Sequence, residues 1–182
     1  MSNPTSRRPA PATLADDFDL QKYMTNINSD DPLRIVLSGH LYIEAALTAL
    51  IECVLPFPDD LPVSKESFER KIRLAMALGV LHPTEAAGYR ALNELRNDLA
   101  HTVPPHVTVG QTERLVDQLS KLQKTAIEGG IADHVIRPGR DLQPVLVGLF
   151  VILQSRYNTA PEPKALSLTT WRARLEGANR NA

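Results

Sequence analysis

The sequence contains almost no cysteine: Cys53 is the only one in 182 residues, and it lies within an apolar stretch. A single thiol excludes a disulfide framework and a thiolate metal cluster, which predicts a protein of the reducing cytoplasm. An excess of charge of either sign is also missing, since the formal net charge is -1. Proteins that hold nucleic acid by neutralising many phosphates are usually clearly basic, so this class is disfavoured, although a local basic patch stays open.

Long hydrophobic runs are absent as well. The apolar run at residues 145–153 is nine residues long, whereas a membrane-spanning helix needs about 20. The longer stretch at residues 33–55 is interrupted by Arg34, His40, Glu44 and Glu52. The N-terminus lacks the apolar segment of a secretory signal. We therefore expect neither a membrane span nor a signal peptide.

The composition that remains suits one domain of ordinary size. With 43% hydrophobic residues, the chain can bury a single core without disulfides or metals. We predict a disordered tail at residues 1–13, which contain three prolines, and a helical bundle at residues 14–158. Residues 159–182 should form a linker with two prolines and a short helix that holds Trp171.

Capping residues and prolines set the expected ends of the helices. Asp30 or Asp31 should cap the most buried helix, and Ser64 should cap the next one, which should stop at Gly79. Pro83 should open a further helix, which the proline pair at residues 104–105 would end. Apart from the helix that Pro83 opens, the expected helices of the bundle span residues 14–27, 33–55, 65–78, 111–127 and 141–157.

Apolar residues recur with helical spacing through most of the chain, and only a doubtful stretch at residues 106–109 alternates with period two. The sequence therefore predicts an all-α fold. We expect a single-domain, up-and-down bundle of about five helices joined by short loops.

The most specific motif is LNELRNDLAH at residues 92–101, where an amphipathic helix ends with an Arg-Asn pair and a histidine. It follows an apolar helix containing GHLYIEAALTALI and a second helix, KIRLAMALGVL, that turns at a glycine. This order of pieces resembles the HEPN superfamily of small helical proteins, in particular its mannitol-repressor-like (MtlR) branch. The resemblance covers roughly residues 39–101, and it depends on the glycine corner and on Arg96, Asn97 and His101.

The resemblance implies two different functions. In the superfamily, an Arg, a polar residue and a His at this spacing mark metal-independent ribonucleases, many of them toxins or anti-phage proteins that act as dimers. In the mannitol-repressor branch, a similar helical body serves a regulator of transcription that is not known as an enzyme. The motif thus indicates the fold more specifically than the activity.

Cleavage of RNA without a metal needs a base for the 2′-hydroxyl, an acid for the leaving oxygen, and positive charge at the phosphorane. Histidine is the side chain whose unperturbed pKa lies near neutrality, so His101 would be the acid or the base. Arg96 would supply a planar cation for the phosphate oxygens. Asn97, four residues before His101, would orient the imidazole or the ribose, and Glu44 on the apolar helix is a further candidate partner.

Helical geometry separates two of these groups. At about 100° per residue, Arg96 and His101 lie roughly 140° apart around a helix axis. The apolar stripe of the same helix consists of Gly88, Leu92, Leu95 and Leu99. Arg96 would flank this stripe, and His101 would point away from it. Both groups can meet at one phosphate only if the helix unwinds near Thr102, or if a twofold pairing of this helix brings two sets around one cleft.

A purely structural interpretation explains the same residues. A histidine in the last turn of a helix is favoured by the helix dipole, and Arg96 can pair with Glu44 or with an acid on its own helix. Arg70, Lys71 and Arg73 could line an RNA groove, or they could form the solvated face of a helix. Both interpretations stay open at the level of sequence.

Other chemistries lack a pattern. His82 and Glu85 do not fit a metal-ligand motif such as H-E-x-x-H, and no phosphate-binding glycine loop is present, so we predict no metal and no cofactor. His40, in the apolar helix, is expected to be a hydrogen-bonded core or interface residue. We find no helix-turn-helix recognition helix and therefore do not expect direct DNA binding.

Two hypotheses follow. The first is a cytoplasmic, homodimeric HEPN-type endoribonuclease of toxin or defence character, whose partners are RNA and a protein such as an antitoxin. The second is a non-enzymatic regulator resembling the mannitol operon repressor, which acts through protein partners and uses the motif as a dimer interface.

Overall fold

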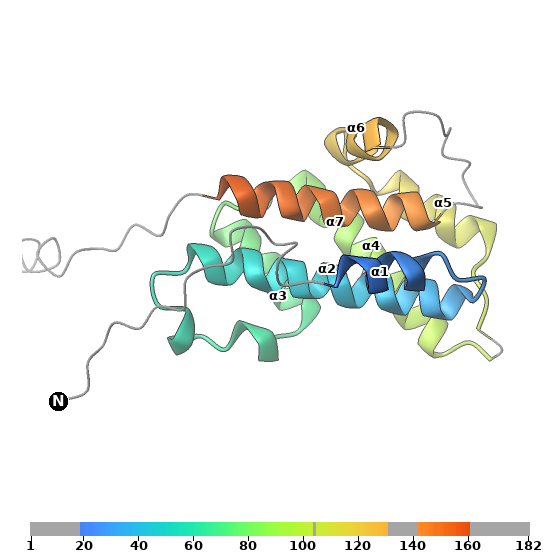
Figure 1. Cartoon of the computed structure of the whole chain (residues 1–182), viewed down its shortest axis with the longest axis horizontal. Coiled ribbons are helices and arrows are strands. Elements are labelled where there is room, and N and C mark those ends of the chain that lie inside the picture. The colour runs from blue at the N-terminus through green and yellow to red at the C-terminus, as the bar shows by residue number, and fades with distance from the viewer. Residues whose placement is uncertain (1–18, 104, 131–141, 161–182) are drawn as a thin grey trace, which may run out of the picture.

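The computed structural model describes residues 19–103, 105–130 and 142–160, which are coloured in Figure 1. These residues form seven α-helices and two short 3-10 helices, and no strand. The elements are α1 (Leu20–Ile27), α2 (Pro32–Val54), η2 (Pro58–Asp60), η3 (Val63–Lys65), α3 (Phe68–Ala77), α4 (Pro83–Ala100), α5 (Val109–Asp117), α6 (Lys121–Gly130) and α7 (Leu142–Thr159). The all-α prediction is confirmed for the described residues, and the prediction of about five helices is wrong.

One additional helix arises where a single helix was expected at residues 111–127. The chain leaves α5 at Asp117 and starts α6 at Lys121. Ser120 caps α6, because its hydroxyl accepts a hydrogen bond from the backbone N–H of Gln123 at 3.2 Å. The side chain of Gln123 in turn accepts one from the backbone N–H of Ser120 at 2.8 Å. This reciprocal capping breaks the helix without a glycine or a proline.

The start of α3 also differs from the expected one. Ser67, not Ser64, is the N-cap, and its hydroxyl accepts a hydrogen bond from the backbone N–H of Arg70 at 3.3 Å. Ser64 lies in η3, the turn that places Val63 in the core. Burial of Val63 therefore decides between two serines that are equally good caps by residue type.

Helix α2 forms the centre of the core. Asp31 caps it, Pro32 occupies its first turn, and it contacts α1, α3, α4 and α7. In Figure 1, α2 and α7 lie side by side and run in the same direction. Gly39 permits this close approach, because a Cβ atom there would lie 2.6 Å from a methyl carbon of Leu146. Among the described helices, α2 alone has the length and apolar composition of a membrane span, but core helices of soluble proteins share these properties, and half of its apolar window is buried in the bundle.

The corner between α3 and α4 agrees with the sequence prediction. Gly79 has φ +73°, the left-handed conformation that favours glycine after a helix. Val80 and Leu81 then turn back into the core. Helix α4 begins at Pro83, and its stripe of Gly88, Leu92, Leu95 and Leu99 is buried as predicted. The motif-bearing helix is thus fixed against α2, α3 and α5.

Some predictions lie outside the described residues. They concern the tail at residues 1–13, the start of the first expected helix before residue 19, and the C-terminal helix that holds Trp171. No strand is formed at residues 106–109, where the chain runs into α5.

Candidate functional site

The motif occupies the last two turns of α4 and the residue that follows. Arg96 and Asn97 are exposed, and the Nη1 atom of Arg96 donates a hydrogen bond to Oδ1 of Asn97 at 2.9 Å. His101 is exposed at the C-cap of α4. Within the described residues, the side chain of His101 forms no hydrogen bond or ion pair with Arg96 or Asn97. The structure therefore brings Arg96 and Asn97 into contact and leaves His101 separate. We call these three residues the α4 motif.

The end of α4 bears on the expected unwinding near Thr102. The helix stops at Ala100, and His101 has φ −108° and ψ 2°, outside helical geometry. The backbone N–H groups of His101 and Thr102 bond to the carbonyls of Asp98 and Leu99, three residues back, at 3.2 and 3.3 Å. These short-range bonds tighten and end the helix one residue before His101. The helical-wheel angle therefore does not fix the direction of the His101 side chain.

A group of polar side chains, two of them buried and two half-buried, lies between α2, α3 and α4. We call it the His40 cluster, and it consists of His40, Glu44, Lys71 and Asn93. Lys71 is only 3% exposed, and its Nζ atom lies 2.6 Å from Oε1 of Glu44. The prediction that Lys71 lines an RNA groove is therefore wrong. The sequence did hold a signal for this burial. Lys71 comes three residues after Phe68 and four residues before Ala75, so it lies on the same buried face of α3 as both. Glu44 bonds to this lysine rather than to the α4 motif.

His40 occupies the middle of that cluster. It is 5% exposed, its Nε2 atom lies 3.1 Å from Oδ1 of Asn93, and its Nδ1 atom lies 3.8 Å from Oε2 of Glu44. Its ring also packs against Phe68, with 4.4 Å between ring centroids. Burial lowers the pKa of His40, while Asn93 and Glu44 oppose this shift and the positive charges of Arg96 and Lys71 reinforce it. The folded state consequently binds this proton less well than the unfolded chain, so acidification through the ordinary histidine range disfavours folding.

The two other basic residues predicted for RNA binding lie on the outer face of α3. Arg70 pairs with Glu66, and Arg73 pairs with Glu69, each at 2.9 Å and with the acid four residues earlier. Exposed pairs of this kind are worth about 0 to 1 kcal/mol, so they hold the arginines weakly. Both guanidinium groups stay accessible to solvent. The predicted basic patch thus retains two of its three members.

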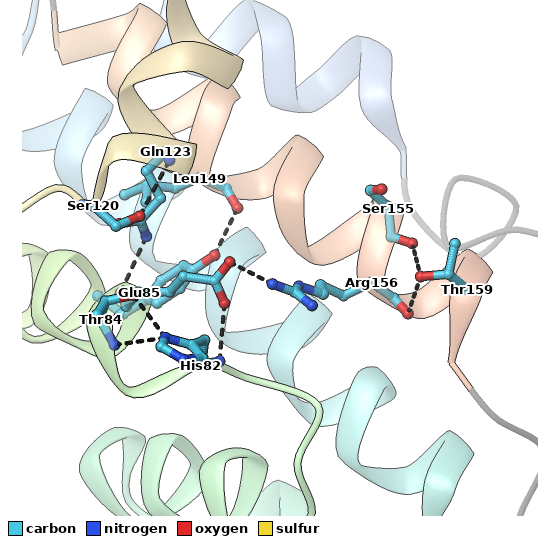
Figure 2. A network of polar contacts seen from close by, with 10 residues as sticks. His82, Thr84, Glu85, Ser120, Gln123, Leu149, Ser155, Arg156 and Thr159 are labelled. Atoms are coloured by element: carbon cyan, nitrogen blue, oxygen red, sulfur yellow. Dashed lines mark hydrogen bonds and ion pairs between the residues drawn. The ribbon is translucent and has the colours of Figure 1, made fainter.

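A second polar network, shown in Figure 2, joins α4 to α6 and α7 and was not predicted. We call it the Glu85 network, after its buried carboxylate, which is 1% exposed. One oxygen of Glu85 accepts a hydrogen bond from Nη2 of Arg156 at 2.6 Å, and the other accepts one from the backbone N–H of His82 at 2.9 Å. The side chain of Gln123 donates to the backbone carbonyl of Glu85 at 3.1 Å. His82 and Glu85 therefore cap α4, and Glu85 also bonds to α6 and α7.

The Glu85 network borders an open surface pocket of about 630 Å³. Its polar lining includes His82, Lys121 and Arg156. Because Arg156 neutralises Glu85 and His82 caps α4, two of these polar groups are already engaged within the protein. We therefore assign this network to stability rather than to chemistry. Within the described residues, no three His, Cys, Asp or Glu side chains lie close enough together to hold a metal ion.

Comparison with protein-family models, with curated proteins and with solved structures finds no match for this chain.

Proposed function

We propose that this chain is a homodimeric, metal-independent endoribonuclease of HEPN type, with a toxin or defence role in the cytoplasm. The observation that carries the proposal is the exposure of Arg96, Asn97 and His101 at one end of α4. A salt-bridged or core role would have placed these polar groups against acids or inside the bundle. Instead, the described residues leave a cation, an amide and an imidazole facing solvent.

The chemistry follows from the donors and acceptors that these side chains carry. His101 takes the proton of the ribose 2′-hydroxyl, whose oxygen attacks the phosphorus as the bond to the 5′-oxygen breaks. The leaving 5′-oxygen receives a proton from a second histidine. Arg96 uses one N–H to hold Asn97, and the rest of its planar fork faces the phosphorane oxygens. The products are a 2′,3′-cyclic phosphate and a free 5′-hydroxyl.

A dimer supplies the second histidine. One protomer offers a single His101, which forms no hydrogen bond with Arg96 within the described residues. A twofold pairing of α4 gives one cleft two copies of each motif residue, so that one histidine acts as base and the other as acid. Arg70 and Arg73, on the exposed face of α3, would extend this cleft as weak contacts to the RNA backbone.

The primary test uses RNA in the presence of EDTA. The purified protein is expected to cleave single-stranded RNA without added metal and to leave 2′,3′-cyclic phosphate ends, detected by mass spectrometry. The same sequence with 2′-O-methyl groups should remain intact, because it lacks the attacking hydroxyl. If no RNA in a varied panel is cleaved, or if the methylated RNA is cut equally well, the proposed activity is wrong.

Mixed dimers test the shared cleft. Wild-type protein is unfolded and refolded with roughly a ninefold excess of His101→Ala, so that nearly every wild-type protomer pairs with a variant. A cleft that needs both histidines predicts that activity per wild-type chain falls about tenfold, because few dimers hold two intact protomers. A site complete within one protomer predicts no such fall. Light scattering confirms the dimer before each assay.

The regulatory alternative makes a different prediction from the same surface. If α4 is only a dimer interface of a repressor-like protein, Arg96→Ala weakens the dimer and no RNA is cleaved by any variant. Sedimentation equilibrium measures the dimer constant. A protein partner, such as an antitoxin, would then bind the dimer rather than the RNA-cleaving site.

A further inference from the structure

The α4 motif is connected to the core by one side-chain contact that neither hypothesis uses. Asn93 lies on α4 one turn before Asn97 and three residues before Arg96. Its Oδ1 atom lies 3.1 Å from Nε2 of His40 on α2. Because residues three and four apart share a helix face, Asn93 and the two exposed motif residues line the same edge of α4. The motif surface thus continues inward to a buried histidine.

The protonation state of His40 determines which group donates the hydrogen bond between His40 and Asn93. A neutral imidazole carries one N–H, and burial lowers the pKa of His40, which favours the neutral form at pH 7. Nε2 is within hydrogen-bond distance of the Asn93 oxygen, whereas 3.8 Å separates Nδ1 from Glu44. His40 therefore donates from Nε2 to Asn93. The lysine that bonds to Glu44 completes the connection to α3.

Burying these polar side chains costs free energy of folding, so we ask what the His40 cluster provides that apolar packing does not. Burying a histidine and a lysine in the core requires hydrogen bonds that only restore what water supplied. Apolar side chains of similar size would pack these helices equally well, and the buried stripe of α4 sets the coarse rotation of the helix, but neither fixes the exact rotation of the edge that carries the motif. A directional hydrogen bond between α2 and α4 fixes that rotation.

We propose that His40 is a positioning residue of the α4 motif, acting through its hydrogen bond to Asn93. The proposal rests on the proposed ribonuclease function, since the motif that is positioned is the one assigned to RNA cleavage. His40 itself does not touch the substrate. It holds Asn93 against α2, so that Arg96 and Asn97, one turn further on, face the same cleft in both protomers.

Three variants separate positioning from packing. His40→Leu keeps an apolar bulk and removes the donor, whereas His40→Gln keeps an N–H that can reach Asn93. Asn93→Ala removes the acceptor from the half-buried α4 side and disturbs the core less. Ser38→Ala is the matched control, because Ser38 is half-buried on α2 outside the His40 cluster. Chemical denaturation establishes that each variant is folded.

The first measurement does not depend on RNA cleavage. Hydrogen exchange of the full-length protein, followed by mass spectrometry, should show roughly fivefold faster exchange at residues 94–101 in His40→Leu and Asn93→Ala, with α7 unchanged. His40→Gln and Ser38→Ala should match the wild type. If exchange at residues 94–101 is unchanged in both His40→Leu and Asn93→Ala, the proposal is wrong, whatever the cleavage assay gives.

The second measurement separates the proposal from the ribonuclease function. In RNA cleavage, His40→Leu and Asn93→Ala should lower kcat between about tenfold and a hundredfold with KM unchanged, and His40→Gln should restore it. If kcat is equal in the wild type, His40→Leu and Asn93→Ala, the positioning role of His40 is wrong, but the proposed ribonuclease function is not affected. If wild-type protein does not cleave RNA, the proposed function fails by itself, and hydrogen exchange still decides whether His40 positions the motif.

Discussion

Replacement of His101 by alanine is expected to lower the rate of RNA cleavage by about a hundredfold to ten-thousandfold, the usual contribution of a general acid or base. In a cleft that uses two copies of His101, the substitution removes both the base and the acid. Single-turnover rates with a defined RNA measure the chemical step without product release. The substitution should leave RNA binding nearly unchanged, since the phosphate contacts belong to arginines.

The fold should tolerate this change. His101 is exposed at the end of α4, and within the described residues its side chain forms no hydrogen bond. Its loss removes no hydrogen bond or ion pair from the part of the fold that the structure describes, and surface substitutions of this kind usually change the free energy of unfolding by less than about 0.5 kcal/mol. A small change in the unfolding midpoint together with a large loss of cleavage therefore identifies a chemical role.

His106→Ala is the matched control. His106 is also an exposed histidine, five residues beyond the motif. Its replacement should change cleavage less than about twofold, because a general acid or base must lie within hydrogen-bond reach of the reacting group. Equal rates for wild type and His101→Ala would mean that the cleavage belongs to a contaminating nuclease or to other residues.

Local sequence signals predicted the frame that carries the motif. Asp31 with Pro32, Gly79, and Pro83 each act within a few residues of themselves, and each ends or begins a helix as expected. The buried stripe of α4 was equally visible, because its spacing is that of one helix face. The break between α5 and α6 was missed, since reciprocal capping by Ser120 and Gln123 leaves no glycine or proline as a marker.

Contacts between distant parts of the chain were not predictable in the same way. Lys71 and Glu44 are separated by 27 positions, and His40 and Asn93 by 53. Whether such residues meet depends on the relative rotation of α2, α3 and α4, which periodicity within one helix does not determine. The helix that carries the motif was therefore predicted correctly, whereas the polar cluster beneath it required the three-dimensional structure.

Removal of Arg156 is expected to produce the largest loss of stability among surface-accessible side chains of the described residues. Arg156→Met leaves the carboxylate of Glu85 buried without its cationic partner, a situation that typically costs about 3 to 5 kcal/mol. Since Glu85 keeps its hydrogen bond from the His82 backbone, we expect about 3 kcal/mol, or roughly 6 to 12 °C in the unfolding midpoint. Calorimetry and urea denaturation measure both quantities.

The contrast with Arg70→Met decides whether burial of the acid is the cause. Arg70 also pairs with a glutamate, at 2.9 Å, but the side chain of that acid, Glu66, is 22% exposed, so the substitution should cost less than about 1 kcal/mol. Adding Glu85→Gln to Arg156→Met should recover most of the lost stability, because a neutral amide can still accept from His82 and needs no cation. If the two arginine variants are equally destabilised, or if the double variant gains nothing, desolvation of the Glu85 carboxylate is not what makes Arg156 necessary. The link from α4 to α7 is then held by apolar packing and by the hydrogen bond from the Tyr89 hydroxyl to the Leu149 carbonyl.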